Sequence, residues 1–207
     1  SFFHCALLII HSKLIAMNFI ASYINLLNNG VLKNRAEKAY AKLESCTSCP
    51  RDCNVDRING EYGICTSGHL PIVSSYTPHF GEEPVLSGTK GAGNIFFGNC
   101  NLKCIYCQNF EISQSPKTEK HKEVTHDRLA EIMIELQNKC CHNIGLVSPT
   151  HFSATILKSI YIAAQKGLNI PIIYNTNGYD SVDMLKLYDG VIDIYLPDFK
   201  YGNSEYA

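Results

Sequence analysis

The sequence predicts an α/β protein that is built around a parallel sheet. From Ile95 onward, short apolar runs alternate with stretches of helical periodicity, which is the pattern of successive βα units. Each apolar run is followed by polar residues, and parallel α/β folds place their reactive groups at the carboxyl ends of their strands. We therefore expect a sheet with one functional edge.

Four strands are predicted, with helices between them. The strands are expected at residues 95–97, 144–147, 172–174 and 191–196. The helices are expected at residues 126–138, 153–166 and 182–187. No internal repeat is visible beyond this alternation.

The chain upstream of the sheet divides into three parts. Ser1 is followed only at position 17 by a methionine, so the first residues are interpreted as an upstream extension. Amphipathic patterns at 18–29, closed by Gly30, and at 31–44 predict two helices. The predicted regions are an extension at 1–16, helices at 17–45, a four-cysteine metal-binding region at 46–90 and the α/β core at 91–207.

Charge and hydropathy exclude two classes of partner. The 18 Lys and Arg residues balance 19 Asp and Glu residues, and they are scattered, so the basic patch of a nucleic-acid or anionic-membrane binder is missing from the sequence. The apolar run at 2–10 is shorter than the ~20 residues of a spanning helix, and no secretory signal pattern is visible. We expect a cytoplasmic protein that binds neither nucleic acid nor membrane.

Three cysteines follow the first predicted strand within eight residues, at Cys100, Cys104 and Cys107. Closed structural zinc sites use four protein ligands, and self-contained iron–sulfur clusters usually take four cysteines. Three thiols with no near fourth therefore predict a cluster with one open metal position, which can bind a further ligand. The alternative is three loop thiols without metal.

The spacing Cys-x3-Cys-x2-Cys, with an aromatic residue before the last cysteine, resembles the signature of radical S-adenosylmethionine (SAM) enzymes. The resemblance extends over about residues 17–207 to the proteins described as pyruvate formate-lyase activating enzyme-like. The segments that carry it are 46–68, 79–88, 93–113, 143–152 and 174–201.

This resemblance implies a chemistry and a set of cofactors. Cys100, Cys104 and Cys107 would hold a 4Fe-4S cluster whose fourth iron binds SAM, and Tyr106 would lie near the adenine. Reductive cleavage of SAM would give a 5′-deoxyadenosyl radical that abstracts a substrate hydrogen. The implied partners are an electron donor such as flavodoxin or ferredoxin and a glycyl radical enzyme as protein substrate.

The sequence departs from the activating enzymes after the second strand. Their Gly-Gly-Glu motif, which receives the amino group of SAM, is replaced by Ser148, Pro149 and Thr150. We predict that Ser148 and Thr150, helped by backbone carbonyls, bind this amine. Residues Asn177, Asp198 and Lys200 fall where the activating enzymes carry polar residues that face cofactor or substrate; capping and turn roles are the alternative.

A second group of cysteines comprises Cys46, Cys49, Cys53 and Cys65. Four thiols form a closed ligand set, and in a reducing cytoplasm such a group more often holds metal than disulfides. A bound metal adds folding free energy on the order of 10 kcal/mol to small zinc-finger peptides. Zinc and a second iron–sulfur cluster both accept four thiolates, and a redox disulfide through Cys46 and Cys49 is the third alternative.

The predicted fold is thus a partial (β/α) barrel of the radical SAM type, preceded by a small helical and four-cysteine segment. Four strands are predicted where the superfamily's partial barrel has six, so we interpret the barrel as truncated to about four βα units. The predicted function is a radical SAM enzyme that abstracts hydrogen. The alternative is a non-catalytic iron–sulfur or zinc module, or an inactive truncated remnant.

Overall fold

The structure is a computed structural model that describes residues 19–115, 119–200, 202–203 and 205. The predicted extension at 1–16 lies outside the described residues. Within the described part, no helix combines the length and the apolar character needed to cross a membrane.

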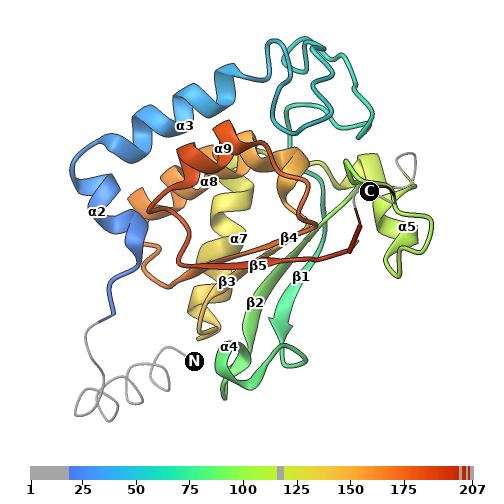
Figure 1. Cartoon of the computed structure of the whole chain (residues 1–207). Coiled ribbons are helices and arrows are strands. Elements are labelled where there is room, and N and C mark those ends of the chain that lie inside the picture. Colours follow the sequence, from blue (N-terminus) through green and yellow to red (C-terminus); the bar gives the residue numbers. More distant parts are fainter. Residues whose placement is uncertain (1–18, 116–118, 201, 204, 206–207) are drawn as a thin grey trace, which may run out of the picture.

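A five-stranded, mostly parallel sheet forms the centre of the fold (Figure 1). The strand order follows the chain, from β1 to β5. Strands β2 to β5 pair in parallel, and β1 pairs with β2 in the antiparallel direction. The strands are β1 (Val73–His79), β2 (Ala92–Phe97), β3 (Ile144–Val147), β4 (Ile172–Thr176) and β5 (Ile194–Pro197). The predicted α/β class is confirmed, and the sheet is consistent with a partial radical SAM barrel.

The sequence analysis missed β1. The strand alternates between buried and partly exposed residues and contains Pro78, which has no backbone N–H to donate to a neighbouring strand. Both features are typical of an edge strand. They are also typical of turns, so the sequence pattern does not distinguish β1 from the turn residues around it. Since β1 lies within the predicted region 46–90, the sheet begins upstream of residue 91.

The four predicted strands are present, but the last of them starts later than expected. It was predicted from residue 191, whereas β5 begins at Ile194. The two preceding apolar residues, Val191 and Ile192, are buried in the core without belonging to the strand. These two residues are apolar because they lie in the core, although they are not in a strand. The apolar run therefore predicted a strand that is too long.

Three helices lie on one side of the sheet (Figure 1): α7 (His126–Asn138), α8 (Ser153–Gln165) and α9 (Val182–Tyr188). The first matches its prediction, and the Thr125 side chain caps it by accepting a hydrogen bond from the Arg128 N–H at 3.1 Å. Its residues Leu129, Ile132, Met133 and Leu136 are spaced three and four apart, so they form one buried face.

The N-terminal helices are α2 (Ser22–Asn28) and α3 (Val31–Ala41), each shorter than predicted. Helix α3 packs on α8 and α9, which places it in a second helical layer outside them. The short elements are α4 (Pro84–Ser87), α5 (Phe110–Ser113), η1 (Lys120–Lys122) and η2 (Thr150–Phe152). The helices therefore cover one side of the sheet and leave its carboxyl edge to loops.

Candidate functional site

A cavity of about 400 Å³ lies at the carboxyl ends of the parallel strands. It is lined from four successive strand ends, because neighbouring parallel strands end at the same edge of the sheet. Of the residues predicted from the sequence, those that line it are Cys100, Cys104, Tyr106, Cys107, Ser148, Asn177, Asp198 and Lys200.

Thr150 is the one predicted cofactor-binding residue that does not line this cavity. Its buried hydroxyl donates to Asp180 Oδ1 at 2.7 Å and lies 3.2 Å from Thr176 Oγ1. Thr176 is the last residue of β4 and Asp180 lies in the loop after it, so the hydroxyl of Thr150 joins two strand ends. Of the two residues predicted to bind the amino group of SAM, only Ser148 lines the cavity.

The loop after β2 carries the three cysteines in a fixed conformation. Asn99 has a left-handed backbone, with φ of 63°, which asparagine tolerates better than most residues. Its N–H donates to the carbonyl of Ile112 at 2.8 Å, and its side chain donates to the carbonyl of Thr66 at 3.0 Å. The start of the loop is thereby tied to α5 and to the four-cysteine region.

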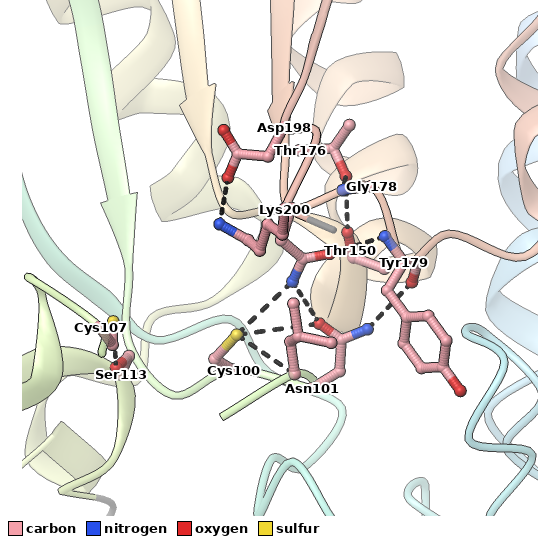
Figure 2. Close-up of polar contacts among 12 residues, drawn as sticks. Cys100, Asn101, Cys107, Ser113, Thr150, Thr176, Gly178, Tyr179, Asp198 and Lys200 are labelled. Atoms are coloured by element: carbon pink, nitrogen blue, oxygen red, sulfur yellow. Dashed lines mark hydrogen bonds and ion pairs between the residues drawn. The ribbon is translucent and has the colours of Figure 1, made fainter. Parts of the chain in front are cut away.

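The sulfur atoms of this loop have polar neighbours. The Leu102 N–H donates to Cys100 Sγ at 3.3 Å, and Asn177 Nδ2 donates to the same sulfur at 3.6 Å. Cys107 Sγ lies 3.3 Å from Ser113 Oγ. Figure 2 shows Ser113 beside Cys107 and the polar contacts of Cys100. Hydrogen bonds to a thiolate stabilise its charge, which is the state that binds iron.

Asn101 was not predicted from the sequence. It is fully buried and contacts two predicted residues, Cys100 and Asn177. Its Oδ1 accepts a hydrogen bond from Asn177 Nδ2 at 2.9 Å, and its Nδ2 donates to the carbonyl of Tyr179 at 3.1 Å (Figure 2). Asn101 therefore connects the cysteine loop to the loop after β4. It occupies a variable position of the cysteine spacing, so the motif gives no signal for it.

The loop after β5 contributes an ion pair to the cavity. Lys200 Nζ lies 2.6 Å from Asp198 Oδ2. Partial burial opposes the charge of Lys200, but the hydrogen bond and charge of Asp198, together with Cys104 and Cys100, outweigh it and raise the pKa of Lys200. The cavity thus holds an ion pair beside the thiols, and Lys103 adds a second cationic side chain to its lining.

Gly178 allows the loops after β4 and β5 to approach each other. Its φ is 78°, and a Cβ atom at this position would lie 2.8 Å from the carbonyl oxygen of Asp198. Any other residue would therefore be strained in its backbone and would press on the segment that carries Asp198 and Lys200. The sequence analysis did not single out this glycine.

The three thiols fit a cluster that shares its site with a small molecule. They are only partly buried, and they border a cavity with room beside them. Among the described residues, no three His, Cys, Asp or Glu side chains are spaced to hold a single metal ion. The thiols therefore border an open space and do not form a closed single-ion cage.

The four-cysteine region encloses a much smaller cavity, of about 10 Å³. Cys46, Cys49, Cys53 and Cys65 all line it. Burial raises the pKa of the Cys49 thiol, while hydrogen bonds from the Arg51 backbone and the Asn101 side chain act in the opposite direction. The four predicted ligands are thus together, next to the loop that carries the other three.

Comparison with known proteins identifies the family. A family model described as the Radical SAM superfamily matches residues 94–207, and the chain belongs to this superfamily. Membership implies a 4Fe-4S cluster and SAM binding. The matched residues include the three-cysteine loop and the strand ends that line the large cavity.

Two curated relatives come from Methanocaldococcus jannaschii. The chain is 32% identical over 206 residues to the Uncharacterized protein MJ0674, covering 95% of this chain and 58% of that protein. It is 29% identical over 188 residues to the Uncharacterized protein MJ0808, covering 81% of this chain and 53% of that protein. The chain thus spans little more than half the length of these relatives. No solved structure matches it.

Proposed function

We propose that this protein is a radical SAM enzyme that generates a 5′-deoxyadenosyl radical and uses it to abstract hydrogen from a substrate. The observation that carries the proposal is that Cys100, Cys104 and Cys107 line one cavity with polar groups from three further strand ends. When bound, a reduced 4Fe-4S cluster supplies the electron that splits SAM into methionine and the radical.

The side chains of the cavity match the charges of the cofactor. The methionine part of SAM carries an ammonium and a carboxylate, and Asp198 and Lys200 offer one group of each opposite sign. Ser148 adds a hydroxyl at the end of β3. Tyr106 brings an aromatic ring to the same wall, which suits stacking on a nucleoside base.

The experiment is anaerobic reconstitution with iron and sulfide, followed by dithionite and SAM. We expect release of 5′-deoxyadenosine from the wild-type chain and none from the Cys104→Ala variant. Iron and sulfide that bind without SAM cleavage would instead support a non-catalytic iron–sulfur module. Wild-type thiols that bind no iron would overturn both functions.

A narrower proposal concerns the partners. The resemblance to pyruvate formate-lyase activating enzyme-like proteins supports a glycyl radical enzyme as substrate and flavodoxin or ferredoxin as electron donor. Ile105 on the cysteine loop is 98% exposed, and Phe110 at the start of α5 is 54% exposed, so apolar side chains are available there for a protein partner.

The partner proposal is tested with pyruvate formate-lyase and reduced flavodoxin. Electron paramagnetic resonance should detect a glycyl radical when both are present with SAM. An Ile105→Ser variant should weaken this activation while leaving dithionite-driven SAM cleavage unchanged. Cleavage of SAM without a glycyl radical would overturn the partner and leave the radical chemistry in place.

A further inference from the structure

We propose that Cys46, Cys49, Cys53 and Cys65 form a second metal centre and that Arg57 is its buried counter-charge. The ligand is a thiophilic metal group that four thiolates can hold, an iron–sulfur cluster or a zinc ion. The described cysteines are not spaced for a single ion, which favours the cluster. The superfamily match begins at residue 94, so this segment lies outside it.

The four thiols converge although they are spread over twenty residues of sequence. Cys46, Cys49 and Cys65 are each 7% exposed, and Cys53 is partly buried. Gly63 is needed for this convergence, because a Cβ atom at its position would lie 2.8 Å from Cys53 Sγ. The chain therefore brings four sulfur atoms around one small enclosed space.

Arg57 is the strongest sign that this space holds negative charge. Its side chain is 1% exposed and donates hydrogen bonds to the carbonyls of Gly68 and His151, the latter at 2.8 Å. Its Nη1 also lies 3.7 Å from Cys46 Sγ. Within the described residues, no carboxylate lies within ion-pair distance of Arg57.

A buried cation without a counter-charge is costly, so its presence calls for an anion nearby. Four neutral thiols supply no charge. Four thiolates around Zn²⁺, or around an iron–sulfur cluster, leave a net negative group, which a guanidinium next to Cys46 offsets. The carbonyls of Gly68 and His151 and the ring of Phe152 accommodate the guanidinium but carry no formal charge. A negatively charged metal centre would supply the counter-charge that free thiols lack.

His151 adds an independent observation. It also lines the small cavity and is 1% exposed. Its Nε2 bonds to the carbonyl of Gly98 at 2.8 Å, whereas its Nδ1 is buried with no hydrogen-bond partner. With Nε2 donating, Nδ1 is a buried acceptor without a partner, which is uncommon. Its lone pair is of the kind that binds metal, although it says nothing about the charge of the centre.

The proposed centre lies next to the loop of the radical site. Asn101 acts to lower the pKa of the Cys49 thiol on one side and lies 3.9 Å from Cys100 Sγ on the other. Arg51, between two of the four cysteines, donates to the carbonyl of Asn101 at 3.0 Å and contacts that of Leu102 at 3.4 Å. A filled second centre would therefore hold the loop that presents Cys100; this step alone rests on the proposed function.

The first test removes the radical site and measures metal directly. In a variant with Cys100, Cys104 and Cys107 all changed to Ala, elemental analysis and sulfide determination follow anaerobic purification and reconstitution. Zinc, or iron with sulfide, in at least equimolar amount supports the centre and identifies the metal. A folded triple variant that binds neither metal overturns it. SAM cleavage plays no part, so failure of the proposed function would be seen separately in the wild-type chain.

The second test isolates the counter-charge. In the same triple variant, Arg57→Met removes the charge and keeps the length of the side chain, and Arg57→Lys keeps the charge. Competition with a chelator should show metal affinity about 10–100-fold lower in Arg57→Met, the range found for outer-shell partners of metal sites, with much of it restored in Arg57→Lys. Equal affinities in a folded Arg57→Met variant would overturn the role of Arg57.

A milder pair of variants guards against loss of folding. Cys53 is the most exposed of the four, and Cys53→Ser should reduce metal content in the triple variant. Cys141→Ser changes a buried thiol outside both groups and should leave metal content unchanged. Circular dichroism confirms that both remain folded. Unchanged metal content in Cys53→Ser would remove Cys53 from the ligand set and overturn the four-thiolate centre.

Discussion

The two cysteine regions sit side by side but differ in how much space they enclose. The loop with Cys100, Cys104 and Cys107 borders a cavity of about 400 Å³, whereas the four cysteines of the N-terminal region surround one of about 10 Å³. The first set is partly buried, and three of the second set are buried. A metal group that binds other molecules needs an accessible site, whereas a structural metal group is enclosed by its protein ligands.

Their polar neighbours differ in the same sense. Lys200 and Asp198 in the large cavity neutralise each other and remain partly accessible. Arg57 beside the small cavity is buried and has no carboxylate partner among the described residues. The charged side chains of the large cavity can exchange their partner for a bound ligand. The buried charge of Arg57 needs a partner that is always present. The predictions below probe this contrast.

The largest effect is expected at the cysteines of the open region. Cys104→Ala should reduce release of 5′-deoxyadenosine to background, because a cluster ligand is lost. Metal bound by the N-terminal region should be unchanged. Product chromatography and elemental analysis measure both quantities in one preparation. If Cys104→Ala also emptied the N-terminal region, the two regions would form a single centre and the contrast would fail.

Asn177→Ala should give the next largest effect. This side chain donates to Cys100 Sγ at 3.6 Å and to Asn101 Oδ1 at 2.9 Å, so it orients a cluster ligand. Outer-shell partners of metal sites typically contribute a factor of about 10–100 in affinity or activity. Iron retention during chelator challenge should fall by that factor. Asn169→Ala, at an exposed position, is the control and should change nothing.

Gly178→Ala tests the close approach that shapes the open cavity. Left-handed strain and the contact with Asp198 should together lower the free energy of unfolding by roughly 2–4 kcal/mol. Gly167→Ala is a matched control, since its φ is 97° and its Cβ atom would meet nothing within 4 Å. It should cost only the strain, about 1–2 kcal/mol. Urea unfolding measures the free energy of unfolding of both variants. Equal losses would mean that the close contact of Gly178 with Asp198 does not contribute to stability.

The smallest effect concerns the ion pair of Lys200. Its folded pKa is raised above the unfolded value of about 10.4, so its stabilisation is complete below that value and is lost as pH rises through the folded pKa. Solvent in the open cavity limits this contribution to no more than about 1 kcal/mol. In urea unfolding measured over alkaline pH, Lys200→Met should abolish this loss of unfolding free energy.

Lys186→Met is the control for this ion pair, because Lys186 Nζ pairs with Asp183 at 3.0 Å on the exposed surface of α9. It should leave the alkaline loss of stability in place. An alkaline loss that is unchanged in Lys200→Met would show that the open cavity contributes no titrating ion pair to stability.

The sequence predicted most of the parallel sheet. Of the nine residues outside the four-cysteine group that were predicted to bind the cluster or cofactor, eight line the large cavity, and their roles stay predictions. Cysteine spacing and polar residues after apolar strands carry this information locally. Thr150 is the exception, because η2 directs its hydroxyl to Asp180, a residue thirty positions away. Such a pairing depends on how two strand ends meet, and no local pattern encodes it.

The residues that the sequence analysis missed act through distant contacts. Arg57 bonds the carbonyl of His151, 94 residues away, and Asn101 bonds the carbonyl of Tyr179, 78 residues away. Both lie between cysteines of the two groups, but at positions where the spacing of the cysteines does not specify the residue. Strand β1 was missed for a different reason, since Pro78 and its partial exposure are also typical of turns.

The burial of Arg57 has a consequence for the life of the protein in a cell. If the second centre fills as proposed, newly made chains that lack metal carry an uncompensated charge inside the fold and unfold more often. Proteases and chaperones act on such opened chains, so metal supply would set how much of the protein survives. Abundance under metal limitation, more than catalytic rate, is then where this arginine would matter most.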